Sequence, residues 1–313
     1  MVFVLCGTAA VLWASACGGT SSSIHWDDLD AGTGGGVGGG GGAGGGGGTG
    51  GGAGGGGSGG SGGGTGGAGG GAPDSGPVEL VNVVYAHGPS KLYKLDPVTK
   101  AVTLIGTFQG CSNVIDLALD ENSNAFVTTS NGVYSLDLTT VKCTLISTGS
   151  YPNSLSFVPR GALDPSAEAL VGYFGSTYVR INTGTGAISN IGALDGGYAS
   201  SGDIVSVKDG GTFLTVDGNG CADCLIQVNP KTGALIKNFG TVNHAKVWGL
   251  TYWAGALYGF DETGKLFQIS ANGTGITTTN ITIPNGTGLV WWGAGSTTSA
   301  PVVDADGGGI EIY

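Results

Sequence analysis

Short apolar stretches separated by polar turns recur along the chain after residue 77, and no segment keeps a helical periodicity. The clearest pair lies in residues 92–106 (LYKLDPVTKAVTLIG), where an Asp-Pro-Val-Thr-Lys turn joins two apolar runs, as is typical of a tight β-hairpin. Four weaker copies follow. Their turns, like the first, open at polar positions spaced by 41, 45, 47 and 41 residues: Asp96, Asp137, Asn182, Asn229 and Ser270. Strands repeated at this period predict a radially repeated all-β architecture.

Each repeat reads as four short strands, of which the hairpin supplies the third and fourth. The innermost strands are expected to begin at five positions: Val114, Ser154, Asp203, Val247 and Gly288. The first repeat lacks an innermost strand, whereas the last repeat has only that strand, GLVWWGAG at residues 288–295. Joining the two halves gives five four-stranded blades, a count that we favour over six. Such a closure covers the edges that an open array would expose.

The hairpin turns have a chemistry of their own. Asp or Asn can accept hydrogen bonds from backbone N–H groups two residues on, and Gly supplies the positive φ that ends the turn. Lys100 and Val141 replace that glycine in the first two copies, so we expect those two turns to be less well determined. The repeats resemble those of bacterial β-propellers whose blades read LYxIDPxTGxxTxIG. This resemblance implies the fold and no single activity.

The N-terminal sequence is typical of an export signal. Residues 2–16 are apolar or small, are too few to span a bilayer, and end in Ala14-Ser15-Ala16-Cys17. This stretch resembles the signal peptide and lipobox of a bacterial lipoprotein, with Cys17 as the lipidated residue and alanine at the position where leucine is usual. The alternative is an ordinary secretory cleavage site. We therefore predict a lipid-anchored protein of the cell envelope, at the outer membrane or cell surface, or otherwise a secreted one.

A Gly-rich tract separates the N-terminal segment from the folded part of the chain. Many of the 68 glycines lie in residues 34–71, a tract that has almost no side chains to offset the entropy lost on ordering. The predicted organisation is a signal peptide (1–16), a lipidated cysteine with a disordered Gly-rich tether (17–72), a β-propeller (73–304) and a tail (305–313).

The acidic net charge of the chain argues against nucleic acid as a binding partner. The formal net charge is −11, with only 11 Lys and Arg residues, and no basic stripe exists that could neutralise phosphates. We expect no nucleic acid binding and contact with a membrane through the lipid anchor alone. The expected partner is an extracytoplasmic protein or a glycan.

The candidate site is the mouth of the central channel, where the innermost strands begin. Asp116, Ser154, Asp203 and Trp248 lie at or near the start of four of these strands. The two carboxylates and the tryptophan could bind a cation, a sugar or a peptide side chain. The alternative is that they are solvated loop ends and a core aromatic residue. Trp291 and Trp292 are neighbours on one strand, so one should face the core and the other should be more exposed. This pair and Trp248 are candidates for a stacking platform. A carbohydrate-binding head, with Trp248 or Trp291 stacked on sugar rings, is therefore a further alternative.

Catalytic motifs are absent from the sequence, which favours a non-catalytic binding or scaffolding module. An enzyme of the propeller lactonase or lyase kind would need a metal and a carboxylate pair, for which Asp116 and Asp203 are the candidates. We expect no cofactor, and Ca²⁺ in the channel would be the exception. The histidines His25, His87 and His244 stand at unrelated positions and read as solvated loop residues.

Four cysteines remain once Cys17 is assigned to lipid and Cys6 to the signal peptide. Cys221 and Cys224 have the spacing of a redox dithiol, but they lie in a hairpin loop rather than at a helix N-terminus, so a structural disulfide is favoured. Zinc is less favoured because no second ligand pair accompanies them. By elimination, Cys111 would pair with Cys143.

Overall fold

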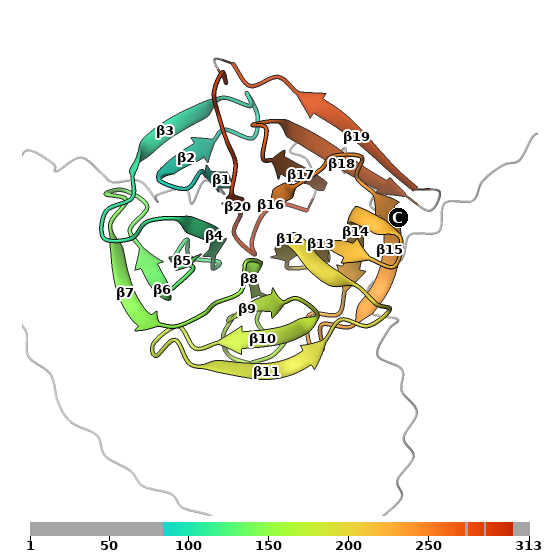
Figure 1. The fold of residues 1–313 in the computed structure, drawn as a ribbon, viewed down its shortest axis with the longest axis horizontal. Coiled ribbons are helices and arrows are strands. Elements are labelled where there is room, and N and C mark those ends of the chain that lie inside the picture. The colour runs from blue at the N-terminus through green and yellow to red at the C-terminus, as the bar shows by residue number, and fades with distance from the viewer. Residues whose placement is uncertain (1–83, 273–274, 285, 303–313) are drawn as a thin grey trace, which may run out of the picture. The chain divides into compact units, whose positions relative to one another are not determined.

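The computed structural model describes residues 84–272, 275–284 and 286–302. These residues form twenty β-strands in five four-stranded antiparallel sheets, arranged around a central axis as the blades of a β-propeller (Figure 1). The predicted all-β fold and the blade count of five are confirmed. No helix in this part of the chain is long and apolar enough to cross a membrane.

The blades are numbered by their order in the chain, and in each the innermost strand is given first. Blade 1 contains β20 (Gly293–Gly295), β1 (Val84–His87), β2 (Lys91–Leu95) and β3 (Val102–Thr107). Blade 2 contains β4 (Val114–Leu119), β5 (Ala125–Thr129), β6 (Gly132–Leu136) and β7 (Cys143–Thr148). Blade 3 contains β8 (Leu155–Val158), β9 (Ala169–Phe174), β10 (Thr177–Ile181) and β11 (Ile188–Ala193). Blade 4 contains β12 (Ala199–Val207), β13 (Gly211–Gly218), β14 (Cys221–Val228) and β15 (Leu235–Thr241). Blade 5 contains β16 (Val247–Trp253), β17 (Ala256–Asp261), β18 (Leu266–Asn272) and β19 (Gly275–Ile281).

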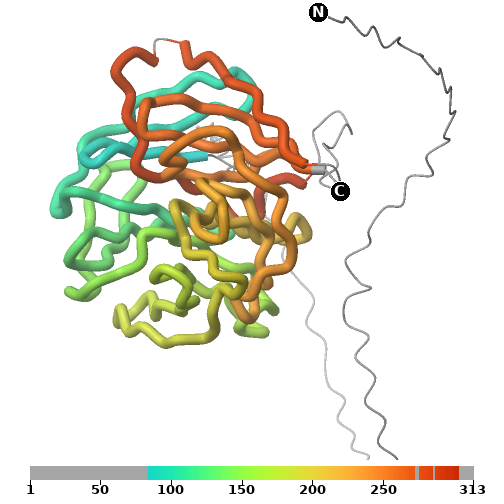
Figure 2. The backbone as a smooth tube through the Cα atoms, turned by 45° about the vertical axis from the view of Figure 1, so that its right-hand side comes forward, coloured from blue at the N-terminus to red at the C-terminus, as the bar shows by residue number. Residues whose placement is uncertain are grey.

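Blade 1 closes the ring with strands from both ends of the described chain. Strand β20 pairs antiparallel with β1, in a register that sets Gly293 opposite His87 and Gly295 opposite Tyr85. Figure 2 shows this C-terminal segment in red beside the first strands in cyan. The predicted closure is therefore confirmed. The strand itself is shorter than the predicted one and begins at Gly293 instead of Gly288.

The outer hairpin turns share one geometry. In the first, Asp96 Oδ1 accepts hydrogen bonds from the N–H groups of Val98 (2.8 Å) and Thr99 (3.0 Å), while Lys100 N–H donates to the Asp96 carbonyl (2.8 Å). Lys100 (φ 60°) and Val141 (φ 58°) take the left-handed conformation that Gly233 takes at φ 69° in blade 4. The same hydrogen bonds therefore form in these two turns without glycine. That the two turns are less well determined stays a prediction.

The apolar core is divided among the interfaces between neighbouring blades. Five clusters of buried side chains are present, and each joins two adjacent sheets. One cluster, for example, packs Val205 and Phe213 of blade 4 against Leu250 and Phe267 of blade 5. Because the cluster between blades 5 and 1 includes Trp291 and Ala294, the C-terminal segment completes the core as well as the sheet.

Both predicted disulfides are present. Cys111, in the segment that leads from blade 1 to blade 2, is bonded to Cys143 at the start of β7. Cys221 and Cys224 are bonded to each other across the start of β14. The predicted signal peptide, Cys17, the tether and the C-terminal tail lie outside the described residues.

Candidate functional site

Asp116 and Asp203 meet at the axis of the propeller. They lie on the innermost strands of blades 2 and 4, both side chains are fully buried, and a hydrogen bond joins their carboxyl groups. The sequence nominated this pair, but it expected the two carboxyls at the channel mouth. They instead occupy the interior of the channel.

Backbone N–H groups of the innermost strands surround the pair. Asp116 accepts hydrogen bonds from Leu117 of its own strand (2.7 Å) and from Leu155 of blade 3. Asp203 accepts from Ile204 of its own strand (2.7 Å), and its Oδ2 accepts from Leu250 of blade 5 (2.9 Å). A further bond to Asp203 comes from the backbone of Ala294 in β20, the innermost strand of blade 1. The carboxyl pair therefore links the innermost strands of all five blades.

The two carboxyls are not equivalent. Burial raises the pKa of Asp116 well above its usual range, and the adjacent charge of Asp203 raises it further. Burial also raises the pKa of Asp203, although its backbone hydrogen bonds act in the opposite direction. Asp116 Oδ2 receives no donor from the described residues, as befits an oxygen that carries a proton itself. We therefore assign one proton to the pair, on Asp116, from which it is donated to Asp203.

His87, at the end of β1, lies near Asp116, since both flank Gly293: a Cβ there would lie 2.4 Å from His87 Nε2 and 2.9 Å from Asp116 Oδ1. Its side chain is fully buried, and its Nδ1–H donates to the Gly88 carbonyl (3.0 Å), so Nε2 carries a lone pair. No described residue donates to Nε2. Burial lowers the pKa of His87 to about 4, against the opposing effect of the Gly88 hydrogen bond, and the ring is therefore neutral at pH 7.

Neither described histidine is the solvated loop residue that the sequence predicted. His244 is largely buried: its ring is stacked on Phe267, with ring centroids 3.6 Å apart, and its Nδ1 lies 3.1 Å from Asp261 Oδ2. His25 lies outside the described residues.

Two other residues assigned to the channel mouth lie in the core. Ser154 is fully buried, and its Oγ accepts a hydrogen bond from the Tyr173 N–H (2.9 Å). Trp291 is also fully buried, and its ring packs edge-on against Tyr93 and Phe260. The placement of Ser154 and Trp291 at the mouth is therefore wrong. The prediction that one tryptophan faces the core and the other is more exposed is confirmed, with Trp292 the more exposed, although both precede β20.

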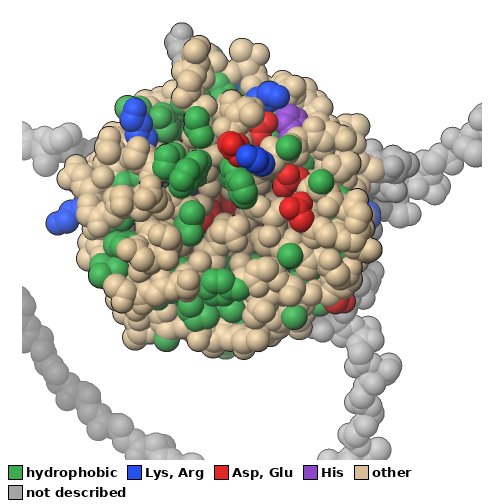
Figure 3. All heavy atoms as spheres, in the orientation of Figure 1, with side chains coloured by type: hydrophobic (Ala, Val, Ile, Leu, Met, Phe, Trp, Pro, Cys, Tyr) green, Lys and Arg blue, Asp and Glu red, His purple; other side chains and the backbone are tan. Residues whose placement is uncertain are grey.

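A pocket of about 410 Å³ lies at the mouth of the channel, within the roughly 300–1,000 Å³ typical of small-molecule sites. The residues that line this channel-mouth pocket are Ile115, Asn153, Trp248, Glu262, Val290 and Trp292. Ile115 and Asn153 directly precede the buried Asp116 and Ser154, which places the pocket over the channel. On this face, hydrophobic side chains gather around the middle, next to acidic and basic ones (Figure 3).

Polar contacts fix one wall of the pocket. The Trp248 indole N–H donates to Glu262 Oε2 (3.4 Å), and Lys246 Nζ lies 2.7 Å from the same oxygen. The backbone N–H of Lys246 donates to Asp223 Oδ2 (2.7 Å). Asp223 lies between the two cysteines of the Cys221–Cys224 disulfide. The disulfide-closed turn thus holds the segment that carries Trp248.

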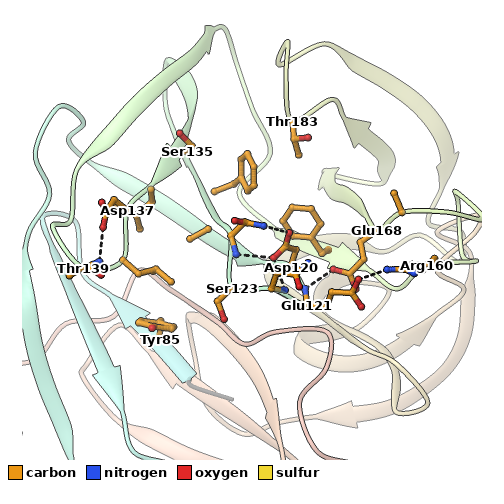
Figure 4. Close-up of a pocket in the computed structure, with 18 of the residues that line it drawn as sticks. Tyr85, Asp120, Glu121, Ser123, Ser135, Asp137, Thr139, Arg160, Glu168 and Thr183 are labelled. Carbon is orange, nitrogen blue, oxygen red and sulfur yellow. Dashed lines mark hydrogen bonds and ion pairs between the residues drawn. The ribbon is translucent and has the colours of Figure 1, made fainter. Parts of the chain in front are cut away.

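The opposite face carries a larger polar groove of about 830 Å³ over blades 2 and 3 (Figure 4). Its charged groups are engaged with one another or with the backbone. Asp120 accepts from the N–H groups of Asn122 and Asn124, Glu121 pairs with Arg160, and Glu168 accepts from the Glu121 N–H. These contacts stabilise the turns that line the groove, so its charged groups already have partners. We therefore take the channel-mouth pocket as the candidate site.

The described residues contain no cluster of three or more His, Cys, Asp or Glu side chains arranged to hold a metal ion. The sequence did not mark Asn153 and Glu262, which lie on loops between strands, and it placed Val290 in an expected strand without marking it as exposed. Trp292 was marked, as one of the tryptophans of the candidate stacking platform.

Comparison with known proteins gives no family. No protein-family model matches the chain, and no curated protein matches it. A chain in the crystal structure of a nidogen/laminin complex is similar over 69% of this chain and 98% of that one, at 10% identity and a TM-score of 0.46. A Bacteroides caccae protein of unknown function is similar over 67% of this chain and 77% of that one, at 12% identity and a TM-score of 0.39.

Proposed function

We propose that this protein is a surface-anchored lipoprotein that presents its β-propeller as a non-catalytic binding or scaffolding module. Cys17 would carry the lipid, and the Gly-rich segment would hold the propeller away from the membrane. The ligand would bind in the channel-mouth pocket. That ligand would be part of an extracytoplasmic protein or a glycan.

The observation that carries this proposal is a largely apolar pocket that lies over a filled channel. Trp248 and Trp292 offer large amphipathic surfaces of the kind enriched at binding sites. The carboxyls that could perform acid–base chemistry are fully buried and already bonded to backbone N–H groups. Binding at the mouth needs no change in that arrangement.

A metal-dependent enzyme of the lactonase or lyase kind is the alternative, and it is favoured by the proximity of Asp116 and Asp203. It would require these carboxyls to exchange backbone partners for a metal ion. Elemental analysis of the purified protein decides between the two: stoichiometric Ca²⁺ or Zn²⁺ that is lost in Asp116→Ala would favour the enzyme.

The anchor is tested by the Cys17→Ser variant. We expect the wild-type protein in the membrane fraction and the variant in the soluble or secreted fraction, because the variant lacks the thiol that would carry the lipid. Unchanged membrane retention would contradict the lipoprotein assignment.

The site is tested by screening the purified full chain against a library of short peptides and a library of oligosaccharides. We expect binders that are lost in the Trp248→Ala/Trp292→Ala double variant and kept in Trp253→Ala. Trp253 is a partly buried tryptophan at the other end of β16, so it serves as a matched control. Binders that survive the double variant, or an absence of binders in both libraries, would overturn the assignment of the site.

A further inference from the structure

The channel-mouth pocket has two kinds of surface side by side. Trp248, Trp292, Ile115 and Val290 supply apolar area, and Val290 is 43% exposed. Asn153 and Glu262 supply an amide and a carboxylate. Among the described residues, the Asn153 side chain has no hydrogen-bond partner. A ligand that fits must cover the tryptophans and satisfy polar groups at its edge.

The polar wall argues against a purely apolar ligand. Such a ligand would remove water from the Asn153 amide and the Glu262 carboxylate without replacing the lost hydrogen bonds, which is unfavourable. The wall does not strongly favour a charged ligand either. Glu262 is already paired with Lys246, whose hydrogen bond lowers the pKa of Glu262, so the carboxylate stays ionised and its charge is balanced. An anion would meet the Glu262 carboxylate, and a cation would have to compete with Lys246 for it.

A neutral ring that bears hydroxyl groups meets these conditions. The C–H-rich face of a sugar ring is flat and apolar enough to pack on an indole, while its hydroxyls point outward from the ring edge. Hydroxyls can donate to a carboxylate and both donate to and accept from an amide. Glu262 retains acceptor sites, because a carboxylate has about four lone-pair positions and the contacts from Lys246 and Trp248 use only part of them.

We propose that the channel-mouth pocket binds a neutral sugar ring. The ring packs on Trp248 and Trp292, and its hydroxyls hydrogen-bond to Asn153 and Glu262. The inference rests on the proposed binding function, and it adds the chemical class of the ligand.

The test uses the purified full chain on a printed array of neutral and acidic oligosaccharides, followed by titration calorimetry with the neutral oligosaccharide that gives the strongest signal. We expect Trp248→Ala and Trp292→Ala each to weaken binding about tenfold, because each removes a packed aromatic face. Asn153→Ala should weaken binding about fivefold through the loss of one neutral hydrogen bond. Trp253→Ala should leave the affinity within twofold of wild type.

Thermal unfolding of every variant provides the control for folding, and Trp248→Phe provides a second test should Trp248→Ala not fold. The phenyl ring keeps an aromatic face but lacks the N–H that binds Glu262, so it should retain part of the affinity. Three outcomes overturn the sugar assignment: no neutral oligosaccharide binds, binding is confined to acidic ones, or binding survives in the tryptophan variants. In the first of these outcomes, peptides that bind and are lost in the double tryptophan variant would leave the binding function standing while the sugar is overturned.

Discussion

Asp116 and Asp203 are the same residue type at the same axis, yet their surroundings assign them different roles. Both oxygens of Asp203 accept backbone N–H groups, from Ile204 and Leu250. Asp116 Oδ2 accepts none. A side-chain amide could therefore replace the protonated Asp116 carboxyl, whereas at Asp203 it would turn its N–H₂ toward a backbone donor.

This asymmetry predicts opposite outcomes for two isosteric substitutions. Asp116→Asn should keep the free energy of unfolding at pH 7 close to that of the wild type, because the amide N–H takes the place of the shared proton. Asp203→Asn should lose at least about 2 kcal/mol, the cost of leaving a buried donor unsatisfied. Urea unfolding measures both, and equal losses in the two variants would contradict the assignment of the proton.

The same proton predicts a pH dependence. The pKa of Asp116 is raised on folding, and an unfolded Asp titrates near 3.9, so above about pH 4 the folded chain holds a proton that the unfolded chain releases. Its contribution to stability is complete below about pH 4 and is lost as the pH rises toward the folded-state pKa, by at most about 1.4 kcal/mol per pH unit. Asp116→Asn should flatten this fall above about pH 4, and an unchanged slope would show that Asp116 does not carry the proton.

At the scale of elements, the hairpin turns do more than reverse the chain. Residues at the glycine position of the turns contact the preceding blade: the Gly233 carbonyl accepts from Tyr173 Oη (2.8 Å), and Lys100 Nζ lies 3.1 Å from Tyr258 Oη. In blade 2, Val141 instead packs beside Gly106. Contacts between blades thus explain why two non-glycine residues are tolerated at this position.

The two disulfides predict different losses of stability. They join residues 32 and 3 positions apart, so the Cys111–Cys143 bond removes far more freedom from the unfolded chain. Cys111→Ser/Cys143→Ser should cost about 4 kcal/mol, and Cys221→Ser/Cys224→Ser about 2 kcal/mol, in urea unfolding. The reverse order would contradict this account. Thiol titration of the unfolded, unreduced wild-type protein should find no free cysteine among these four.

At the scale of the whole molecule, the repeat period and the missing first strand were sufficient to predict five blades and their closure. The sequence also named Asp116 and Asp203 as a pair. It could not show that they are buried, because the depth of a channel depends on how closely the innermost strands approach one another. The innermost strands of blades 5 and 1 approach so closely that a Cβ on Gly249 would lie 2.8 Å from Ala294 Cβ. These two residues are distant in sequence, so the local pattern cannot reveal the approach.

The tryptophans show the same limit. Strand alternation separates Trp291 from Trp292, but only the cluster formed with Tyr93 and Phe260 decides which of them is core. Similarly, His87 ends a strand whose inner neighbour comes from the other end of the chain, so its burial is invisible in the local sequence.

Ring closure predicts the effect of truncation. Deleting residues 288–313 removes β20, Trp291 and a hydrogen-bond donor to Asp203, so the domain should lose its cooperative unfolding transition. Deleting residues 303–313 alone leaves β20 in place and should retain the transition in a calorimetric scan. An intact transition in the longer deletion would contradict the closure.

The most direct test of the functional account is hydrogen–deuterium exchange of the full chain, with and without the neutral oligosaccharide selected on the array. We expect added protection in the segments that contain Ile115, Asn153, Trp248 and residues 290–292, and none in the turns at residues 120–124 and 137–139 on the opposite face. Protection confined to those turns would place the ligand in the other groove and contradict the channel-mouth site.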